Sequence, residues 1–212
     1  MAKAKSAIPQ GLHWVTPHLM LEDANTAIDW YKRAFGAEEV GGRALGPDGK
    51  VMHAHIRIGN SELYANDAMH GGKSAKTLGG SPIGLWIYVE DADAVFNRAL
   101  AAGATVAPGP MGQLQDQFWG DRCGTLIDPE GYNWTIATRK EDLTPEEINT
   151  RMDDVAKEAG VAKGLLYQHF PSKDALFEAL MDEKGTRFGQ RLRAGWADAA
   201  GDDVGPRDPA RL

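Results

Sequence analysis

Residues 21–37, LEDANTAIDWYKRAFGA, decide the fold, because a related stretch, VEDADAVFNRALAAGA, follows at residues 89–104. Each copy has the pattern of a short strand, an aspartate that caps a helix, an amphipathic helix and a glycine that ends it. Apolar residues recur at helical spacing in both copies. The copies start 68 positions apart (21 to 89), which is too long for a small solenoid repeat and fits a duplicated half-domain.

Strand patterns follow each predicted helix. Residues 51–58 alternate, which predicts a strand with Met52, Ala54, Ile56 and Ile58 facing the core. The turn at Gly59-Asn60 predicts a hairpin with residues 62–66, and residues 120–127 and 132–138 flank a second turn. Each half is therefore predicted to contain a strand, a helix and about three strands. Two such halves give an α+β fold with helices on one side of curved sheets.

Composition limits the class of protein. The chain has 212 residues, of which 42% are hydrophobic and 25% charged, as in soluble globular proteins. We expect no membrane span and no secretory leader, because no sufficiently long apolar run is present. A single cysteine, Cys123, excludes an internal disulfide framework and fits a cytoplasmic location. The net charge of −7 argues against nucleic-acid binding through bulk charge.

Four short motifs carry a resemblance to a known family. They are Thr16-Pro17-His18-Leu19, residues 49–54 (GKVMHA), residues 118–122 (FWGDR) and Asp128-Pro129-Glu130-Gly131. Together with the doubled pattern, they resemble the PhnB-like branch of the vicinal oxygen chelate superfamily, which includes glyoxalase I, bleomycin-resistance proteins and extradiol dioxygenases. The resemblance covers about residues 10–148. It implies a domain over residues 1–148, built of two βαβββ modules whose sheets curl around a cup.

Alternation along the predicted strands then selects the side chains that line the cup. The predicted ligand-binding residues are His18, His53, His55, Arg57, Tyr64, Trp86, Tyr88 and Trp119. The last of these lies in the segment 113–122, which would either close over the cup as a lid or plug the end of the core. Imidazole, aromatic and guanidinium groups suit a planar or anionic small molecule.

The metal-dependent members of the family place ligands at four strand positions. The resemblance maps these positions to Thr16, Tyr64, Gly84 and Thr135, none of which is a good ligand for a divalent metal. We therefore expect no metal and no cofactor. One alternative is a displaced metal site formed by His18, His53 and His55.

Cys123 allows two interpretations. Its neighbour Arg122 would favour a thiolate nucleophile. A lone cysteine on a strand is more often a small buried residue.

The C-terminal part of the sequence has a different character. Thr144, Pro145 and Glu147 predict the start of a helix. Residues 150–181 then resemble the helix-turn-helix of TetR-type repressors, with helices expected over 146–160, 163–170 and 173–181. The resemblance implies that four residues lie near DNA: Lys163, Tyr167, His169 and Lys173.

Two observations favour a helical appendage over DNA binding. We expect no counterpart of the helix that precedes this motif in TetR-type domains, and none of the ligand-binding domain that follows it. Charges in this part of the chain are also nearly balanced, which gives no strong attraction for phosphate. We expect a partial TetR-type segment over 150–194 that packs on the first domain or mediates association, and a disordered tail over 195–212.

The leading functional prediction is a small-molecule-binding protein that lacks the family metal and sequesters its ligand, as bleomycin-resistance proteins do. A first alternative is an enzyme of the same fold that uses the displaced histidines with a metal or as acid–base groups. A second is a ligand-responsive DNA-binding fusion protein. Exposed sheet edges favour a homodimer.

Overall fold

The repeat in the sequence folds into two modules with the same order of elements. The computed structural model describes residue 4 and residues 6–158. The first module contains β1 (His18–Leu21), α1 (Ala24–Phe35), β2 (Glu38–Glu39), β3 (Ala44–Leu45), β4 (Val51–Ile58) and β5 (Ser61–Asp67). The second contains β6 (Gly84–Tyr88), α2 (Ala92–Ala101), β7 (Thr105–Val106), β8 (Gln115–Asp116), β9 (Asp121–Ile127) and β10 (Asn133–Arg139).

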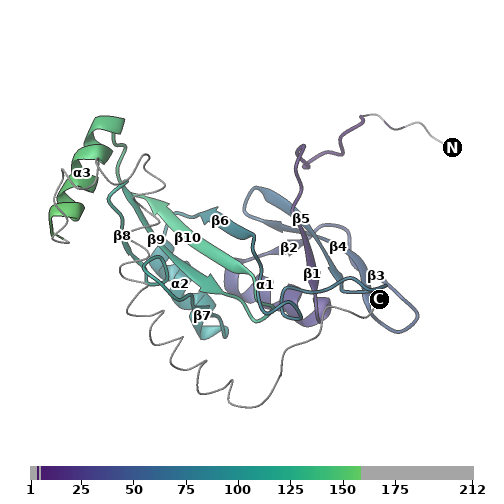
Figure 1. The fold of residues 1–212 in the computed structure, drawn as a ribbon. Coiled ribbons are helices and arrows are strands. Elements are labelled where there is room, and N and C mark those ends of the chain that lie inside the picture. Colours follow the sequence, from purple (N-terminus) through teal and green to yellow (C-terminus); the bar gives the residue numbers. More distant parts are fainter. Residues whose placement is uncertain (1–3, 5, 159–212) are drawn as a thin grey trace, which may run out of the picture. The chain divides into compact units, whose positions relative to one another are not determined.

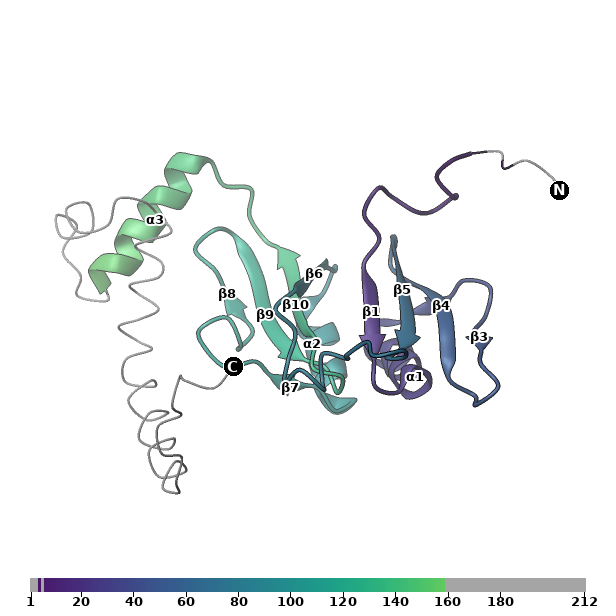
Figure 2. The same ribbon diagram turned by 45° about the vertical axis from the view of Figure 1, so that its right-hand side comes forward.

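Each module forms its own mixed sheet, and the two sheets have the same topology. The first sheet has the order β1-β5-β4-β2, and the second has the order β6-β10-β9-β7. In each sheet the first strand is parallel to the last strand of its module, and the other pairs are antiparallel. Figures 1 and 2 show two open sheets, with α1 beside the first and α2 beside the second. The α+β prediction of two βαβββ-type modules is confirmed; the short strands β3 and β8 were not predicted.

The two helices begin where the sequence predicted. Asp23 and Asp91 have extended backbones, with φ of −136° and −135°, and each accepts a hydrogen bond from the backbone N–H three residues later. Helix α1 ends at Gly36, whose φ of +70° lies in the left-handed region that glycine tolerates. The local sequence signals therefore set the start of both helices and the end of α1.

One hydrophobic core joins the modules through contacts between α1 and α2. The Trp30 indole donates to the Ala102 carbonyl at 2.9 Å, and Arg98 donates to the Ala34 carbonyl at 2.8 Å. The buried Asp128 accepts from the Tyr31 hydroxyl and the Trp134 indole, both at 2.8 Å. Because Tyr31 belongs to the first module and Trp134 to the second, the Asp128 carboxylate links the two modules through hydrogen bonds.

Strand β4 differs from the predicted alternation at its start. Ala54, Ile56 and Ile58 are buried as expected, but Met52 is 51% exposed and Val51 is buried instead. The pairing with β3 runs from Ala44–His53 to Leu45–Val51, so Met52 is an extra residue without an opposite partner. The prediction that Met52 faces the core is therefore wrong, because a bulge interrupts the alternation.

The chain divides after Ile148 into two units, and the sheets, α1 and α2 belong to the first. Helix α3 (Pro145–Glu158) begins with the predicted capping box, in which the Thr144 N–H donates to Glu147 and the Glu147 N–H donates to the Thr144 hydroxyl. The helices expected over 163–170 and 173–181 and the tail 195–212 lie outside the described residues. None of the helices in the described part of the chain has the length and apolar composition to cross a bilayer.

Candidate functional site

A group of predicted ligand-binding residues lies on one face of the first sheet. His18 is paired with Tyr64 across β1 and β5, and His55 is paired with Tyr64 across β4 and β5. Directly paired residues share a face, so these side chains point away from the core. The ring centroids of His53 and His55 lie 4.8 and 5.2 Å from that of Tyr64, and the His18 ring lies at 6.4 Å. Tyr64 is thus the centre of an imidazole cluster.

Glu62 is the charged partner of this cluster. Its side chain is 5% exposed, and it lies 2.7 Å from His55 Nε2 and 2.9 Å from Arg57 Nη2. The hydrogen bonds from Arg57 are the main reason why the pKa of Glu62 is lowered. Arg57 therefore has an anionic partner within the sheet face, and its charge is largely balanced there.

Asn66 orients the last histidine of the cluster. The His18 ring nitrogen Nε2 and the Asn66 side-chain oxygen are hydrogen-bonded. The Asn66 amide in turn donates to the Asp67 carbonyl at 2.7 Å. These bonds fix the direction of the His18 ring on the open face.

The remaining predicted ligand-binding residues lie on the second sheet. Trp86 is 46% exposed and Tyr88 is 60% exposed. Their neighbours on the strand, Leu85 and Ile87, pack against the core. The ring centroids of Trp86 and Tyr88 are 6.2 Å apart, with planes inclined by 32°. Both aromatic rings therefore stand on the sheet face opposite the core.

Asp121 connects two of these aromatic residues, and the sequence reasoning missed it. Its Oδ2 accepts a hydrogen bond from the Tyr88 hydroxyl at 2.8 Å and from the Trp119 indole at 3.1 Å. The hydrogen bond to Asp121 is the main reason why the pKa of Tyr88 is raised. The alternation of β9 could have indicated this residue, because Asp121 shares the face of Cys123 and Thr125.

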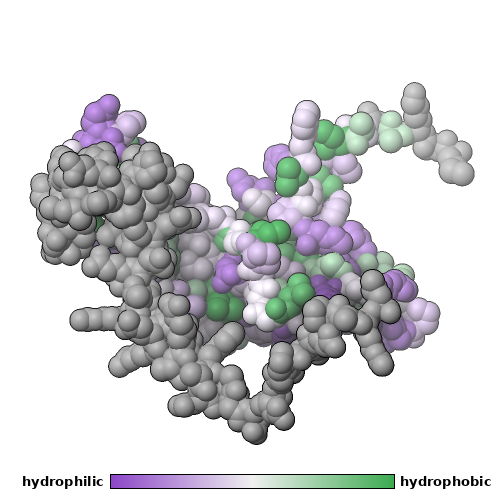
Figure 3. Space-filling model, viewed as in Figure 1, coloured by the Kyte–Doolittle hydropathy of each residue, from purple (hydrophilic) through white to green (hydrophobic). Residues whose placement is uncertain are grey.

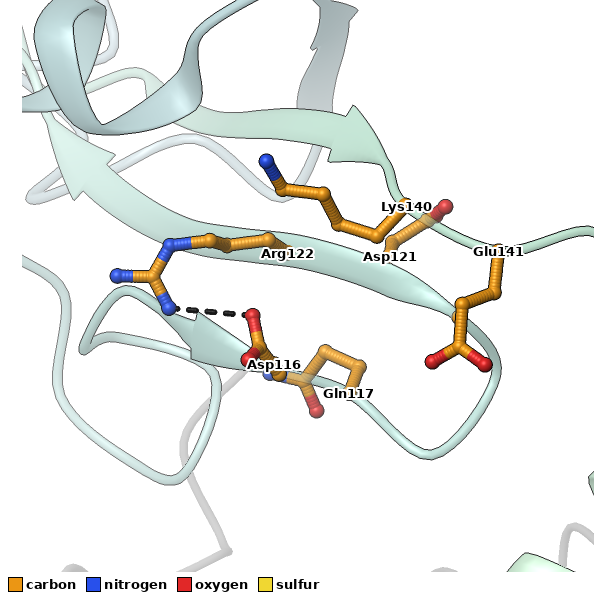
Figure 4. A pocket seen from close by; sticks show the side chains of 7 residues that line it. Asp116, Gln117, Asp121, Arg122, Lys140 and Glu141 are labelled. Atoms are coloured by element: carbon orange, nitrogen blue, oxygen red, sulfur yellow. Dashed lines mark hydrogen bonds and ion pairs between the residues drawn. The ribbon is translucent and has the colours of Figure 1, made fainter.

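The structure places these residues in two groups, one on each sheet. One hollow of about 400 Å³ lies at the end of the second sheet, where Arg122 on β9 reaches Asp116 on β8 (Figure 4). Another, of about 240 Å³, lies beside α1. Neither hollow is lined by a predicted ligand-binding residue. A single cavity shared by both groups stays a prediction.

The surroundings of Cys123 favour the structural interpretation of this residue. The side chain is fully buried, and burial followed by the nearby Asp121 charge raises the pKa of the thiol to about 11. A thiol with this pKa carries little thiolate near neutral pH. The neighbouring Arg122 is turned instead to Asp93, at 2.6 and 2.7 Å.

The four positions that the resemblance marks for metal ligands carry hydroxyl groups or no side chain. The Thr135 hydroxyl shares a hydrogen bond of 2.9 Å with Thr125, and Gly84 has no side chain. Thr16 and Tyr64 offer only neutral hydroxyl groups. Among residue 4 and residues 6–158, no group of three or more His, Cys, Asp or Glu side chains is arranged to hold a metal ion. The residues proposed to contact DNA, Lys163, Tyr167, His169 and Lys173, lie outside the described residues.

Comparison with known protein families identifies the first unit. Residues 11–136 match the glyoxalase/bleomycin resistance protein/dioxygenase superfamily, and the chain belongs to this superfamily. Residues 149–180 match the tetR family of bacterial regulatory proteins. The sequence resemblances to both families are thereby confirmed.

Curated relatives cover different parts of the chain. An uncharacterised protein of Mycobacterium tuberculosis is 44% identical over 143 residues, which cover 65% of this chain and 81% of that protein. Protein YjdN of Escherichia coli is 26% identical over 150 residues, which cover 61% and 98%. An HTH-type transcriptional regulator of Staphylococcus aureus is 47% identical over 60 residues, which cover 27% of this chain and 31% of the regulator.

Solved structures resemble the first unit in fold. TioX from Micromonospora sp. ML1 is 26% identical and has a TM-score of 0.46, covering 62% of this chain and all of TioX. The PhnB protein from Bacillus cereus is 22% identical, with a TM-score of 0.47 and coverage of 59% and 99%. The bleomycin resistance determinant encoded on transposon Tn5 is 17% identical, with a TM-score of 0.45 and coverage of 61% and 100%.

Proposed function

We propose that the protein binds and sequesters a planar small molecule, without the metal used by some members of its superfamily. The observation that carries this proposal is the exposure of Trp86 and Tyr88 on a sheet face. Large aromatic side chains that are open to solvent offer surface on which a planar ligand can stack. Exposing this apolar surface does not stabilise the fold of a monomer. The vacated ligand positions at Thr16, Tyr64, Gly84 and Thr135 support binding without a metal.

The ligand class follows from the residues on the two faces. Stacking on aromatic rings and hydrogen bonds from imidazole groups suit a planar heteroaromatic compound. An anionic group on the ligand has less support, because Glu62 already pairs with Arg57. We therefore expect the ligand to be planar, and we do not expect it to need an anionic group.

A thermal-shift screen of planar compounds tests this function, because a ligand that binds the native state raises the melting temperature. We expect hits whose shift is abolished by Trp86→Ala and Tyr88→Ala. Leu78→Ala is the matched control, since Leu78 is a 59% exposed apolar residue outside both groups. Hits that are equally sensitive to all three substitutions would contradict binding at this face.

We further propose a homodimer in which a second copy completes the cup. The outer strands β1 and β6 leave open sheet edges, and Trp14 and Val15 are 94% and 82% exposed. Figure 3 shows apolar residues on the N-terminal segment and on the visible face of the first unit. Light scattering at micromolar concentration is expected to give twice the chain mass. A monomer that still binds its ligand would contradict the completed cup.

A cytoplasmic location is part of this proposal, because the buried Cys123 is a free thiol, as expected in a reducing compartment.

An enzyme is the second candidate, and the His55–Glu62 pair favours it. A buried carboxylate 2.7 Å from a ring nitrogen places a negative charge beside the imidazole, which favours the protonated form that a general base acquires. Any catalysed reaction should then be lost in His55→Asn and reduced in Glu62→Gln. If the protein only sequesters its ligand, the bound compound should be recovered unchanged after incubation with the protein.

A ligand-responsive DNA-binding protein is the third candidate, supported by the tetR family match over residues 149–180. Its test is DNA binding at low salt, with Lys163→Ala and Lys173→Ala as variants. Binding that is unaffected by both substitutions would argue against a helix-turn-helix contact.

A further inference from the structure

We propose that the aromatic site formed by Trp86, Tyr88 and Trp119 selects planar aromatic cations, and that Asp121 is the positioning residue that sets this preference. The inference rests on the proposed ligand-binding function and narrows its ligand class. It assigns a role to a buried acidic residue that the metal-free binding function does not otherwise require.

Asp121 holds two rings of the site with one oxygen atom. It is the first residue of β9 and is 3% exposed. The Tyr88 hydroxyl and the Trp119 indole nitrogen both donate to its Oδ2, at 2.8 and 3.1 Å. The orientation of both aromatic side chains therefore depends on the same carboxylate.

The charge of this carboxylate is not paired within the described residues. Its other oxygen, Oδ1, is buried and has no hydrogen-bond partner there. Arg139 lies opposite Asp121 on β10 and interacts with its charge, but it forms no salt bridge with Asp121 and donates to Asp142 at 2.6 Å. Arg122, the next residue on β9, points to the other face and pairs with Asp93 and Asp116. The carboxylate thus has two aromatic donors and no salt bridge among the described residues, so its negative charge lies directly beside the aromatic rings.

This arrangement makes the rings better partners for a cation. A carboxylate that accepts hydrogen bonds from a phenol and an indole raises the electron density of both rings. Electron-rich ring faces attract cations through the ring quadrupole. Tyr88 and Trp86 are accessible, since they are 60% and 46% exposed, and their rings lie close enough for one planar ligand to contact both. An anion on the same face would be repelled by Asp121.

The preference can be measured with two planar probes of similar size. We would titrate the full-length protein at neutral pH with 9-aminoacridine, a cation, and with acridine-9-carboxylate, an anion, and follow fluorescence. We expect the cation to bind at least about tenfold more tightly. Asp121→Asn keeps an oxygen that can accept from both rings and removes the charge, so it should lower the cation-to-anion affinity ratio about tenfold.

Asp116→Asn is the matched control, because it removes one negative charge from the same sheet. Its side chain is 79% exposed and pairs with Arg122. We expect it to change the affinity ratio less than about twofold. A second variant, Tyr88→Phe, keeps the ring and loses the hydrogen bond to Asp121, so it should lower the ratio by an intermediate factor. Thermal melting checks that each variant is folded.

The outcomes separate this inference from the proposed function. Equal binding of both probes overturns the cation preference and leaves planar-ligand binding intact. Equal changes in Asp121→Asn and Asp116→Asn assign the preference to net charge and overturn the role of Asp121. Failure of both probes to bind contradicts the proposed function and this inference together.

Discussion

The faces of the two sheets share a backbone plan but differ in their chemistry. On the first sheet, Glu62 forms an ion pair with Arg57 and lies beside His55. Three imidazole rings surround Tyr64. On the second sheet, Trp86 and Tyr88 are exposed beside a carboxylate with no ion pair among the described residues. The duplicated topology fixed the positions on each sheet, while the side chains at those positions diverged. The repeat therefore predicts the architecture of both sheets but not the chemistry of their faces.

The largest expected effect concerns the contact that holds the two modules together. Asp128→Ala removes the acceptor of the Tyr31 hydroxyl and the Trp134 indole, and of the backbone N–H groups of Glu130 and Tyr132. Leaving these buried donors without partners should lower the free energy of unfolding by about 3–5 kcal/mol. Urea unfolding measures this loss.

The control for Asp128→Ala is Asp142→Ala, whose side chain is 93% exposed. It should change the free energy of unfolding by less than about 0.5 kcal/mol. A similar small change for Asp128→Ala would show that the modules are held together by apolar packing alone.

The next effect compares the helix caps of the two modules. Asp23→Ala and Asp91→Ala each remove the side-chain acceptor of a backbone N–H at a helix N-terminus, at 3.0 and 2.9 Å. Asp23 also accepts from the Thr26 hydroxyl at 2.7 Å. Each should lower the free energy of unfolding by about 1 kcal/mol. Thermal or urea unfolding of the two variants checks this, and unequal losses above about 1 kcal/mol would break the equivalence of the modules.

A third prediction concerns acid stability and the ion-pair network of the first sheet. Arg43 and then Lys32 hold the pKa of Glu39 at about 2. Because this pKa is lower in the folded protein than in the unfolded chain, the stabilisation is present at neutral pH. It is lost as pH falls from about 4.5 towards 2.

Glu39→Gln should therefore lower the free energy of unfolding at neutral pH by about 1 kcal/mol, after allowance for solvent screening. The difference from wild type should vanish near pH 2, as measured by urea unfolding across a pH series. Glu38→Gln is the control, because that side chain is 75% exposed. A loss that does not change with pH would exclude the ion pair as its cause.

The smallest effect compares a tyrosine from each face. Tyr88→Phe removes the hydrogen bond to Asp121 and should lower the free energy of unfolding by about 0.5–1 kcal/mol. Tyr64→Phe keeps the ring contacts with the histidines and should change it by less than about 0.5 kcal/mol. If Tyr64→Phe had the larger effect, the first face would depend on its hydroxyl group rather than on ring contacts.

The sequence predicted most of the backbone because the signals for it are local. Asp23, Gly36 and Asp91 lie where the capping patterns placed them, and the apolar stripe of α1 is buried. The error at Met52 arose because a bulge adds one residue to β4, and alternation cannot reveal where it is interrupted. The short strand β8 was missed because two residues carry no periodic pattern.

The side chains on each face were predicted in part. Alternation correctly turned Trp86 and Tyr88 away from the core, because period 2 follows from the pleat of a strand. Alternation could not show that the predicted residues form two separate groups, one on each sheet. That division depends on how the modules are arranged, which local patterns do not record.

The sequence by itself determined the helix caps and the open face of β6, because these depend on neighbours within a few positions. It also determined the duplication and the family, because whole segments of the chain can be compared as strings of residues. Only the tertiary structure decided that Tyr88 bonds Asp121, 33 positions away, and that Tyr31 bonds Asp128, 97 positions away. Such contacts arise when strands and helices from distant parts of the chain are brought together by burial of a common core. Their partners are chosen by distance in space, and a one-dimensional pattern does not contain that distance.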